Sequence, residues 1–356
     1  MWRKIFIVSG VGFLLTLALA GCSTVSYYSQ SVVGHTQLML ARQSVDKLIP
    51  QAPDQLRNQL ELSKRLKRFA EQALSLPASG SYSHYVALER EYPVWNVIAA
   101  PEFSVEPKQW CYLVIGCAAY RGYFAEAAAQ NYALVLQQQG YETLVAGAPA
   151  YSTLGWFNDP ILPSMLRFGD IHFAETLFHE LAHQRLYING DSNFNEAFAT
   201  VVGEVGTERW LQQTDTQALA KYQKQLVAVD QFHQLVLSVK NELAAVYAQS
   251  LSDAELRQVK AQIFTDMRAR YENLKHEKWG GRGWYDRWFD SPVNNARLAV
   301  FSTYRDAVPE LKALLARCGG DLAKFYAVVS AMSHSDPAIL RSDECIGSEL
   351  SDSSEL

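Results

Sequence analysis

His179-Glu180-Leu181-Ala182-His183 is the stretch that decides the fold of this chain, and Asn195-Glu196-Ala197-Phe198-Ala199 follows it closely. Residues four apart share one face of a helix, so His179 and His183 can hold one metal ion together. Glu180 then lies on the flank, where its carboxylate can reach a metal-bound water without ligating the ion. Imidazole and carboxylate ligands suit zinc, and three protein ligands plus water form the usual catalytic arrangement. Glu196 is the expected third ligand.

The flanking sequence predicts two packed helices over residues 170–212. No proline or glycine interrupts residues 175–188, a pattern typical of a buried amphipathic helix. Asn189-Gly190-Asp191 should end this helix, and a second one should run to about Trp210, so that a short turn brings Glu196 back over the first. The alternative is a pair of histidines that only hydrogen-bond in a core. It is less favoured because core helices seldom carry two His and a Glu at adjoining positions.

Further polar residues lie at helical spacing around these ligands. Glu196, Thr200 and Glu204 form a stripe at spacing four. Thr200 or Glu204 can accept the other ring N–H of a ligating histidine and fix its tautomer, and Glu175, one turn before His179, is a candidate of the same kind. Glu204 is also an alternative third ligand. For Glu204 and Glu175, an ordinary solvated or ion-paired carboxylate remains an equal alternative.

These residues resemble the gluzincin metallopeptidases, in which H-E-x-x-H is followed on a second helix by an N-E-x-x-[AS] pattern. Asn195, Glu196 and Ala199 match that second pattern. The gap from His183 to Glu196 is shorter than is usual in the group, so the connecting loop must be tight. Arg185 stands where such helices commonly carry an apolar residue.

The whole chain is similar to the bacterial predicted-aminopeptidase lipoproteins. The resemblance runs from the start of the chain through 120–124 and 150–155 to the two helices and Asn294-Asn295. It implies a zinc peptidase of the bacterial envelope that acts on peptides or proteins. The G-x-M-E-N stretch that grips a free amino terminus in alanyl-type aminopeptidases is absent, so an endopeptidase is the alternative.

The first residues predict a membrane anchor. Arg3 and Lys4 precede an apolar run from Ile5 to Ala20, and Leu19-Ala20-Gly21-Cys22 resembles a lipobox. Cleavage after residue 21 would leave Cys22 as the lipid-bearing amino terminus. An uncleaved membrane helix is the alternative, although sixteen apolar-rich residues are few for spanning. Ser23 follows Cys22, which resembles an outer-membrane address, so we expect a lipoprotein that faces the periplasm with residues 22–35 as a polar tether.

Four cysteines remain after Cys22, an even number that suits disulfides in an oxidising compartment. Three pairings are possible, and the local pairs Cys111–Cys117 and Cys318–Cys345 are preferred. The absence of C-x-x-C spacing argues against a metal site built from these cysteines.

The composition is that of an ordinary globular protein, with 49% hydrophobic and 19% charged residues. A net charge of −5 and the lack of a basic stripe argue against nucleic acid as a partner. Residues 36–347 are expected to form one domain, followed by a disordered Ser- and acid-rich tail at 348–356.

The predicted fold class is α+β and predominantly helical: a gluzincin-like domain in which a small sheet precedes the H-E-x-x-H helix and helices form the C-terminal block. Proline and glycine positions divide the domain into segments. A polar hairpin at 216–278 is expected to be a solvated scaffold rather than a lid, with His233 in it as a surface or core residue. The other segments are N-terminal helices at 36–80 (Thr36–Ile49 and Asp54–Leu76), a sheet region at 81–155 (strands near 94–99, 112–115 and 142–146, with a helix at 124–139) and C-terminal helices at 293–333.

Two further parts of the site are predicted with alternatives open. Tyr151-Ser152-Thr153-Leu154-Gly155 and Asn295 are expected to line the substrate cleft, although the first segment can equally be an ordinary turn. A donor opposite the zinc should stabilise the oxyanion, and Tyr304 is preferred over its rivals Tyr151 and Tyr187. Glu180 would act as general base toward the attacking water. A tethered binding protein with a structural or vestigial zinc site is the non-catalytic alternative.

Overall fold

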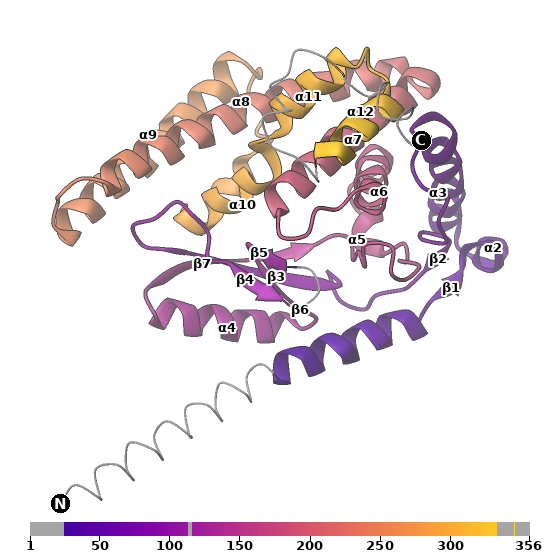
Figure 1. The fold of residues 1–356 in the computed structure, drawn as a ribbon, viewed down its shortest axis with the longest axis horizontal. Helices are drawn as coiled ribbons and strands as arrows, with labels where there is room; N and C mark the ends of the chain where they lie inside the picture. The colour runs from indigo at the N-terminus through magenta and orange to yellow at the C-terminus, as the bar shows by residue number, and fades with distance from the viewer. Residues whose placement is uncertain (1–24, 113–115, 333–344, 346–356) are drawn as a thin grey trace, which may run out of the picture.

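The computed structural model describes residues 25–112, 116–332 and 345 (Figure 1). Within these residues the chain is α+β and predominantly helical, as the sequence predicts. The expected leader, Cys22 and the acidic tail lie outside the described residues. None of the helices in the described ranges is both long enough and apolar enough to cross a bilayer.

Three antiparallel strands form the main sheet, in the order β6 (Arg121–Tyr123), β3 (Val94–Pro101), β7 (Tyr141–Ala148). The strands β3 and β7 contain the predicted segments 94–99 and 142–146 and are slightly longer. Of the predicted strand 112–115, residues 113–115 lie outside the described residues. Because β3 lies in the middle, both of its edges are paired and both of its faces can be covered by helices.

Helices cover both faces of the sheet (Figure 1). Alternate residues of a strand point to opposite faces. Val97 and Ala99 are buried in a cluster with α4 (Glu126–Gln138), which joins β6 to β7. Ile98 packs on the other face, where α10 (Asn295–Arg305) crosses the sheet. The sheet is therefore the middle layer of the molecule, and α10 links it to the helices above.

The largest hydrophobic core lies in the helical layer above the sheet (Figure 1). Two helices at its centre, α6 (Asp170–Arg185) and α7 (Ser192–Thr214), contain the predicted helices of 170–212. Apolar faces of three more helices complete this core: α3 (Asp54–Ala73), α11 (Val308–Arg317) and α12 (Leu322–Met332).

The predicted polar hairpin is present as α8 (Thr216–Tyr247) and α9 (Asp253–Glu277), which extend away from the sheet (Figure 1). Ser252 and Glu255 form a capping box at the start of α9. The hairpin has a hydrophobic cluster of its own, with Phe232 fully buried. His233 is buried next to it and its Nε2 lies 3.0 Å from Oδ1 of Asp306, so it is a core residue.

Both predicted local disulfides are present. Cys111 and Cys117 are opposite each other in a two-stranded ribbon of β4 (Trp110–Tyr112) and β5 (Gly116–Ala118). Cys318, directly after α11, pairs with Cys345. The remaining short elements are β1 (Gln43–Ser44), α2 (Val45–Leu48), η1 (Ile49–Gln51), β2 (His84–Tyr85), α5 (Pro163–Leu166) and η2 (Asp286–Phe289).

The N-terminal region differs from the prediction. Residues 25–35, expected in a polar tether, belong to a helix at 25–40 that packs on the body of the protein. The ring of Tyr27 packs on that of Tyr123, and a Cβ at Gly34 would collide with Phe124, so one face of this helix is fitted to the sheet region. The predicted helix Thr36–Ile49 is interrupted because Gln43–Ser44 pair with β2.

Candidate metal centre

Two glycines let α7 lie close against α6. A Cβ on Gly203 would lie 3.0 Å from the carbonyl oxygen of Glu175 and 3.3 Å from the Cβ of His179. A Cβ on Gly206 would lie 2.9 Å from the ring of Phe178. Any larger residue would therefore push the helices apart, and the backbones can meet only because these side chains are absent. This close approach brings the start of α7 to the histidines of α6.

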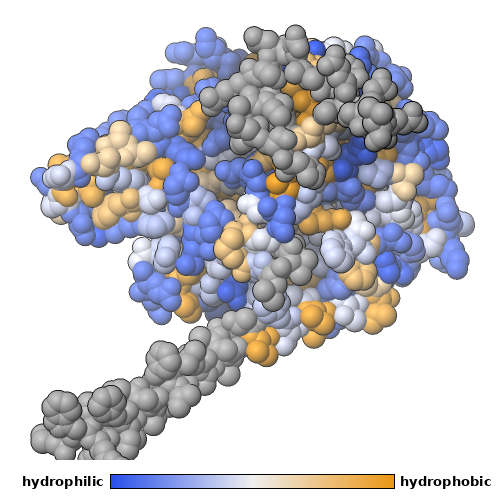
Figure 2. Space-filling view, viewed as in Figure 1, coloured by the Kyte–Doolittle hydropathy of each residue, from blue (hydrophilic) through white to orange (hydrophobic). Residues whose placement is uncertain are grey.

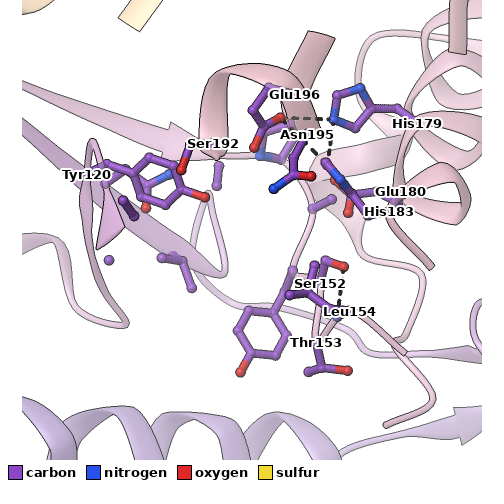
Figure 3. A pocket seen from close by; sticks show the side chains of 18 of the residues that line it. Tyr120, Ser152, Thr153, Leu154, His179, Glu180, His183, Ser192, Asn195 and Glu196 are labelled. Atoms are coloured by element: carbon purple, nitrogen blue, oxygen red, sulfur yellow. Dashed lines mark hydrogen bonds and ion pairs between the residues drawn. The ribbon is translucent and has the colours of Figure 1, made fainter. Parts of the chain in front are cut away.

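Three candidate ligand atoms converge where the two helices meet (Figure 3). The Nε2 atoms of His179 and His183 lie 3.1 Å apart. Oε2 of Glu196 lies 3.2 Å from the first and 3.6 Å from the second. Ligands about 2.05 Å from a tetrahedral zinc are separated by about 3.3 Å from one another. The spacing thus fits the three corners that one zinc ion would need.

The electrostatics of the cluster keep its carboxylate ionised. Burial alone would raise the pKa of Glu196, but the rings of His183 and His179 lower it to about 2. Burial acts to lower the pKa of His183, and the Glu196 carboxylate reverses this and raises it. Glu196 is therefore available as an anionic ligand over the whole neutral range.

Asn195 holds the tight loop between the two helices. Its Nδ2 donates to the carbonyl oxygen of Ile188 at 2.7 Å, and its Oδ1 accepts from the backbone N–H of the same residue at 2.8 Å. Asp191 caps the start of α7 by accepting from the N–H of Phe194. The short gap noted in the sequence is thus closed by a side chain that immediately precedes Glu196.

A cavity of about 1060 Å³ opens onto the three ligands. Its walls come from the helix at 25–40, the sheet, α6, α7 and α10. Glu180 lines it, and Figure 3 shows its side chain beside that of His183. Tyr151, Ser152, Thr153 and Leu154 also line it, as a loop rather than as a sheet edge.

Several tyrosines surround the ligands within this cavity. The ring of Tyr304 stacks on that of His179 with centroids 6.4 Å apart, and the negative charge of Glu196, with burial, raises its pKa well above the usual value. Tyr187 lies on the other side, 6.5 Å from the ring of His183. The hydroxyl of Tyr151 is engaged by Nδ1 of His35 at 3.0 Å. Tyr120, to which no sequence pattern assigns a role, lines the cavity too.

The second helix does not supply the predicted partners for the rings. Glu204 is buried, forms a short ion pair with Arg305 and lies 2.7 Å from Nζ of Lys312, so its carboxylate is occupied by cations of α10 and α11. It is therefore neither a metal ligand nor an acceptor for a histidine. Nδ1 of His183 is buried without a hydrogen-bond partner among the described residues.

Thr200 and Glu175 both line the cavity. Glu175 accepts a hydrogen bond from the hydroxyl of Tyr222 at 2.8 Å, and burial raises its pKa, with the charge of Glu204 adding to the shift. Neither residue has a hydrogen bond to a ligand ring in the described part of the chain.

Asn295 was predicted in the cleft, and the structure places it elsewhere. It is fully buried and is not among the residues that line the cavity. Its Nδ2 donates to the carbonyl oxygens of Pro101 and Glu102, at 3.0 and 2.9 Å, and its backbone N–H donates to Glu142. Asn295 thus ties the start of α10 to the end of β3.

The model of a family described as putative aminopeptidase matches residues 26–341. The chain belongs to this family. Membership indicates a peptidase, and the matched range covers the helix at 25–40, the sheet and the two helices that carry the ligands. No curated protein and no solved structure gives a significant match.

Proposed function

We propose that this member of the aminopeptidase family is a zinc metallopeptidase. The observation that carries the proposal is the convergence of His179, His183 and Glu196, whose ligand atoms lie 3.1 to 3.6 Å from one another in the wall of a cavity. Two imidazoles and a carboxylate are a ligand set of catalytic zinc sites, which leave a fourth position open.

Zinc in this site would lower the pKa of a coordinated water to about 7 and polarise the scissile carbonyl. Glu180, on the adjoining flank of α6, takes the proton from the attacking water and passes it to the leaving amine. Tyr304 donates its hydroxyl proton in a hydrogen bond to the oxygen that becomes negative in the transition state. The position of Tyr304 in the cavity, with its ring stacked on that of His179, supports this role.

The Glu180→Gln variant tests the general base. It keeps the size of the side chain and removes its basicity, so peptide hydrolysis should fall about a hundredfold to ten-thousandfold while zinc content is unchanged. Glu208→Gln, at the far end of α7 from the ligands, is the matched control and should hydrolyse peptides at the parental rate. Parental activity in Glu180→Gln would show that another group is the base.

The family description favours an aminopeptidase within this class. An endopeptidase acting on envelope proteins would use the same catalytic residues and would differ only in how the cavity accepts the chain. Paired peptides of one sequence, with free and acetylated amino termini, distinguish the two. Cleavage of the free form alone is expected. Equal cleavage of both would indicate an endopeptidase, and no chelator-sensitive cleavage of either would favour a structural metal site.

We also propose that the protein is anchored by lipid at Cys22 and faces the periplasm from the outer membrane. The apolar run at 5–20 and the lipobox-like Leu19-Ala20-Gly21-Cys22 support this. Incorporation of labelled palmitate should be lost in Cys22→Ser. Incorporation that persists in this variant would contradict lipidation at Cys22.

A further inference from the structure

The helix at 25–40 has an uncharged surface. From Ile5 to Ala41 the sequence contains no Lys, Arg, Asp or Glu, and the first charged residue after the leader is Arg42. One face of the helix is fitted to the body through Tyr27, Gly34 and Leu38. A helix that lay against water on its other face would normally carry charged residues there.

The outward face of this helix instead exposes large apolar side chains, with the small polar residues Ser29 and Thr36 between them. Val25, Val32 and Leu40 are 66%, 65% and 81% exposed, and Val33 and Tyr28 are 54% and 42% exposed. Residues 25, 28 and 32 follow one another at helical spacing, with 33 and 40 beside them, so the five share one side of the helix. Figure 2 shows hydrophobic side chains along the lower edge of the molecule, where this helix lies in Figure 1. We call these five residues the N-terminal apolar face.

Neighbouring elements also expose apolar side chains. The helix α4 lies along the same side in Figure 1 and contacts Tyr27 through its hydrophobic cluster. Its only charged residue is Glu126, and Leu134 on its surface is 54% exposed. Phe157, 52% exposed, packs its ring 4.6 Å from that of His35. Scattered exposed apolar residues are common, but a group of them over adjoining elements with few charges among them marks an interaction surface.

We propose that the N-terminal apolar face lies on the surface of a lipid bilayer. Only Ser23 and Thr24 separate Cys22 from the helix, so an anchor at Cys22, or at an uncleaved leader, holds Val25 within about 11 Å of the membrane. An interfacial helix buries its apolar side at the level of the headgroups, and aromatic residues such as Tyr28 favour that level.

This orientation has a consequence for the cavity. Tyr28 belongs to the apolar face and also lines the cavity, together with Ser31 and His35 of the same helix. The helix that rests on the bilayer is therefore a wall of the proposed peptidase site, and the cavity is held beside the membrane. The membrane contact rests on the anchor proposed above but not on hydrolysis, so it can fail or hold whether or not the protein is a peptidase.

The test measures the surroundings of the face in the full chain. Val32→Cys and Leu40→Cys carry a nitroxide label, and the proteins are reconstituted into vesicles of phosphatidylethanolamine and phosphatidylglycerol. Paramagnetic resonance then compares accessibility to oxygen, which concentrates in lipid, with accessibility to a nickel chelate, which stays in water. Val227→Cys on α8, where Val227 is 56% exposed, is the matched control, and the unsubstituted chain gives the background label.

The labels at 32 and 40 should favour oxygen, and the label at 227 should favour the nickel chelate. Nickel accessibility at 32 and 40 equal to that at 227 would overturn the proposal, because the face would then lie in water. Shielding of 32 and 40 from both reagents would also overturn it, since the face would then be covered by a second copy or another protein.

Discussion

Replacing Asn195 should disturb the metal site more than the rest of the fold. In Asn195→Ala the backbone N–H of Ile188 loses its partner at 2.8 Å, whereas the carbonyl oxygen loses the amide at 2.7 Å but keeps the N–H of Asp191 at 3.2 Å. A polar group left without a partner costs about 1 to 3 kcal/mol, so unfolding should become roughly 1 to 3 kcal/mol easier. The loop that sets the start of α7 loosens, and zinc affinity should fall because Glu196 adjoins it.

Urea denaturation and competition with a chromophoric zinc chelator measure these two effects. Asn193→Ala is the matched control, because Asn193 is exposed two residues away on the same helix and its loss should change stability by less than about 0.5 kcal/mol. Equal stability and zinc affinity in the Asn195→Ala and Asn193→Ala variants would refute the role of Asn195 in holding the loop.

Two further outcomes follow from the same geometry. Tyr304→Phe should lower kcat by about a hundredfold to a thousandfold with little change in KM. Tyr187→Phe should leave kcat close to the parental value. Steady-state kinetics that show the larger loss in Tyr187→Phe would assign the donor to Tyr187. Burial raises the pKa of Asp159 to about 6 from an unfolded value of 3.8. Below pH 3.8 the carboxyl is neutral in both states, and above about 6 the folded state alone carries a buried charge. The stability that the protonated Asp159 carboxyl contributes is therefore lost as the pH rises from 3.8 to 6. In urea titrations, the free energy of unfolding of Asp159→Asn should rise by roughly 3 kcal/mol relative to that of the parent between pH 3.5 and 7. A difference between the two proteins that does not vary with pH would contradict this.

The sequence predicts the ligands because their geometry is local. His179 and His183 share a helix face through a spacing of four, and the break at Asn189-Gly190-Asp191 returns the chain after one short turn. Local rules also predict the strands bounded by proline and glycine. The preference for local disulfides is also confirmed.

The errors concern partners that are distant in the sequence. Glu204 has the spacing of a residue that supports a ligand, yet its cation Arg305 comes from 101 residues later. Asn295 stands at a helix start, and its acceptors at Pro101 and Glu102 are 194 and 193 residues away. Contacts between residues so far apart leave no periodic pattern in the sequence. They are defined only by the way α10 packs against the sheet in the folded protein.

Two features of the sequence carry further information about packing. Gly203 and Gly206, three residues apart on the second helix, indicate a close helix contact, which is where α6 lies. The segment before residue 36 is rich in Ser and therefore resembles a linker. Tyr27, Gly34 and Leu38 nevertheless recur at helical spacing, and their packing fixes the helix at 25–40 on the body.

Anomalous diffraction at the zinc edge, from crystals of the purified protein, tests the central claim most directly. The account predicts one strong peak about 2.0 to 2.2 Å from Nε2 of His179, Nε2 of His183 and an oxygen of Glu196, with no other protein ligand. A peak bound elsewhere, or the absence of any peak after incubation with zinc, would contradict the proposal that these three side chains form a metal site.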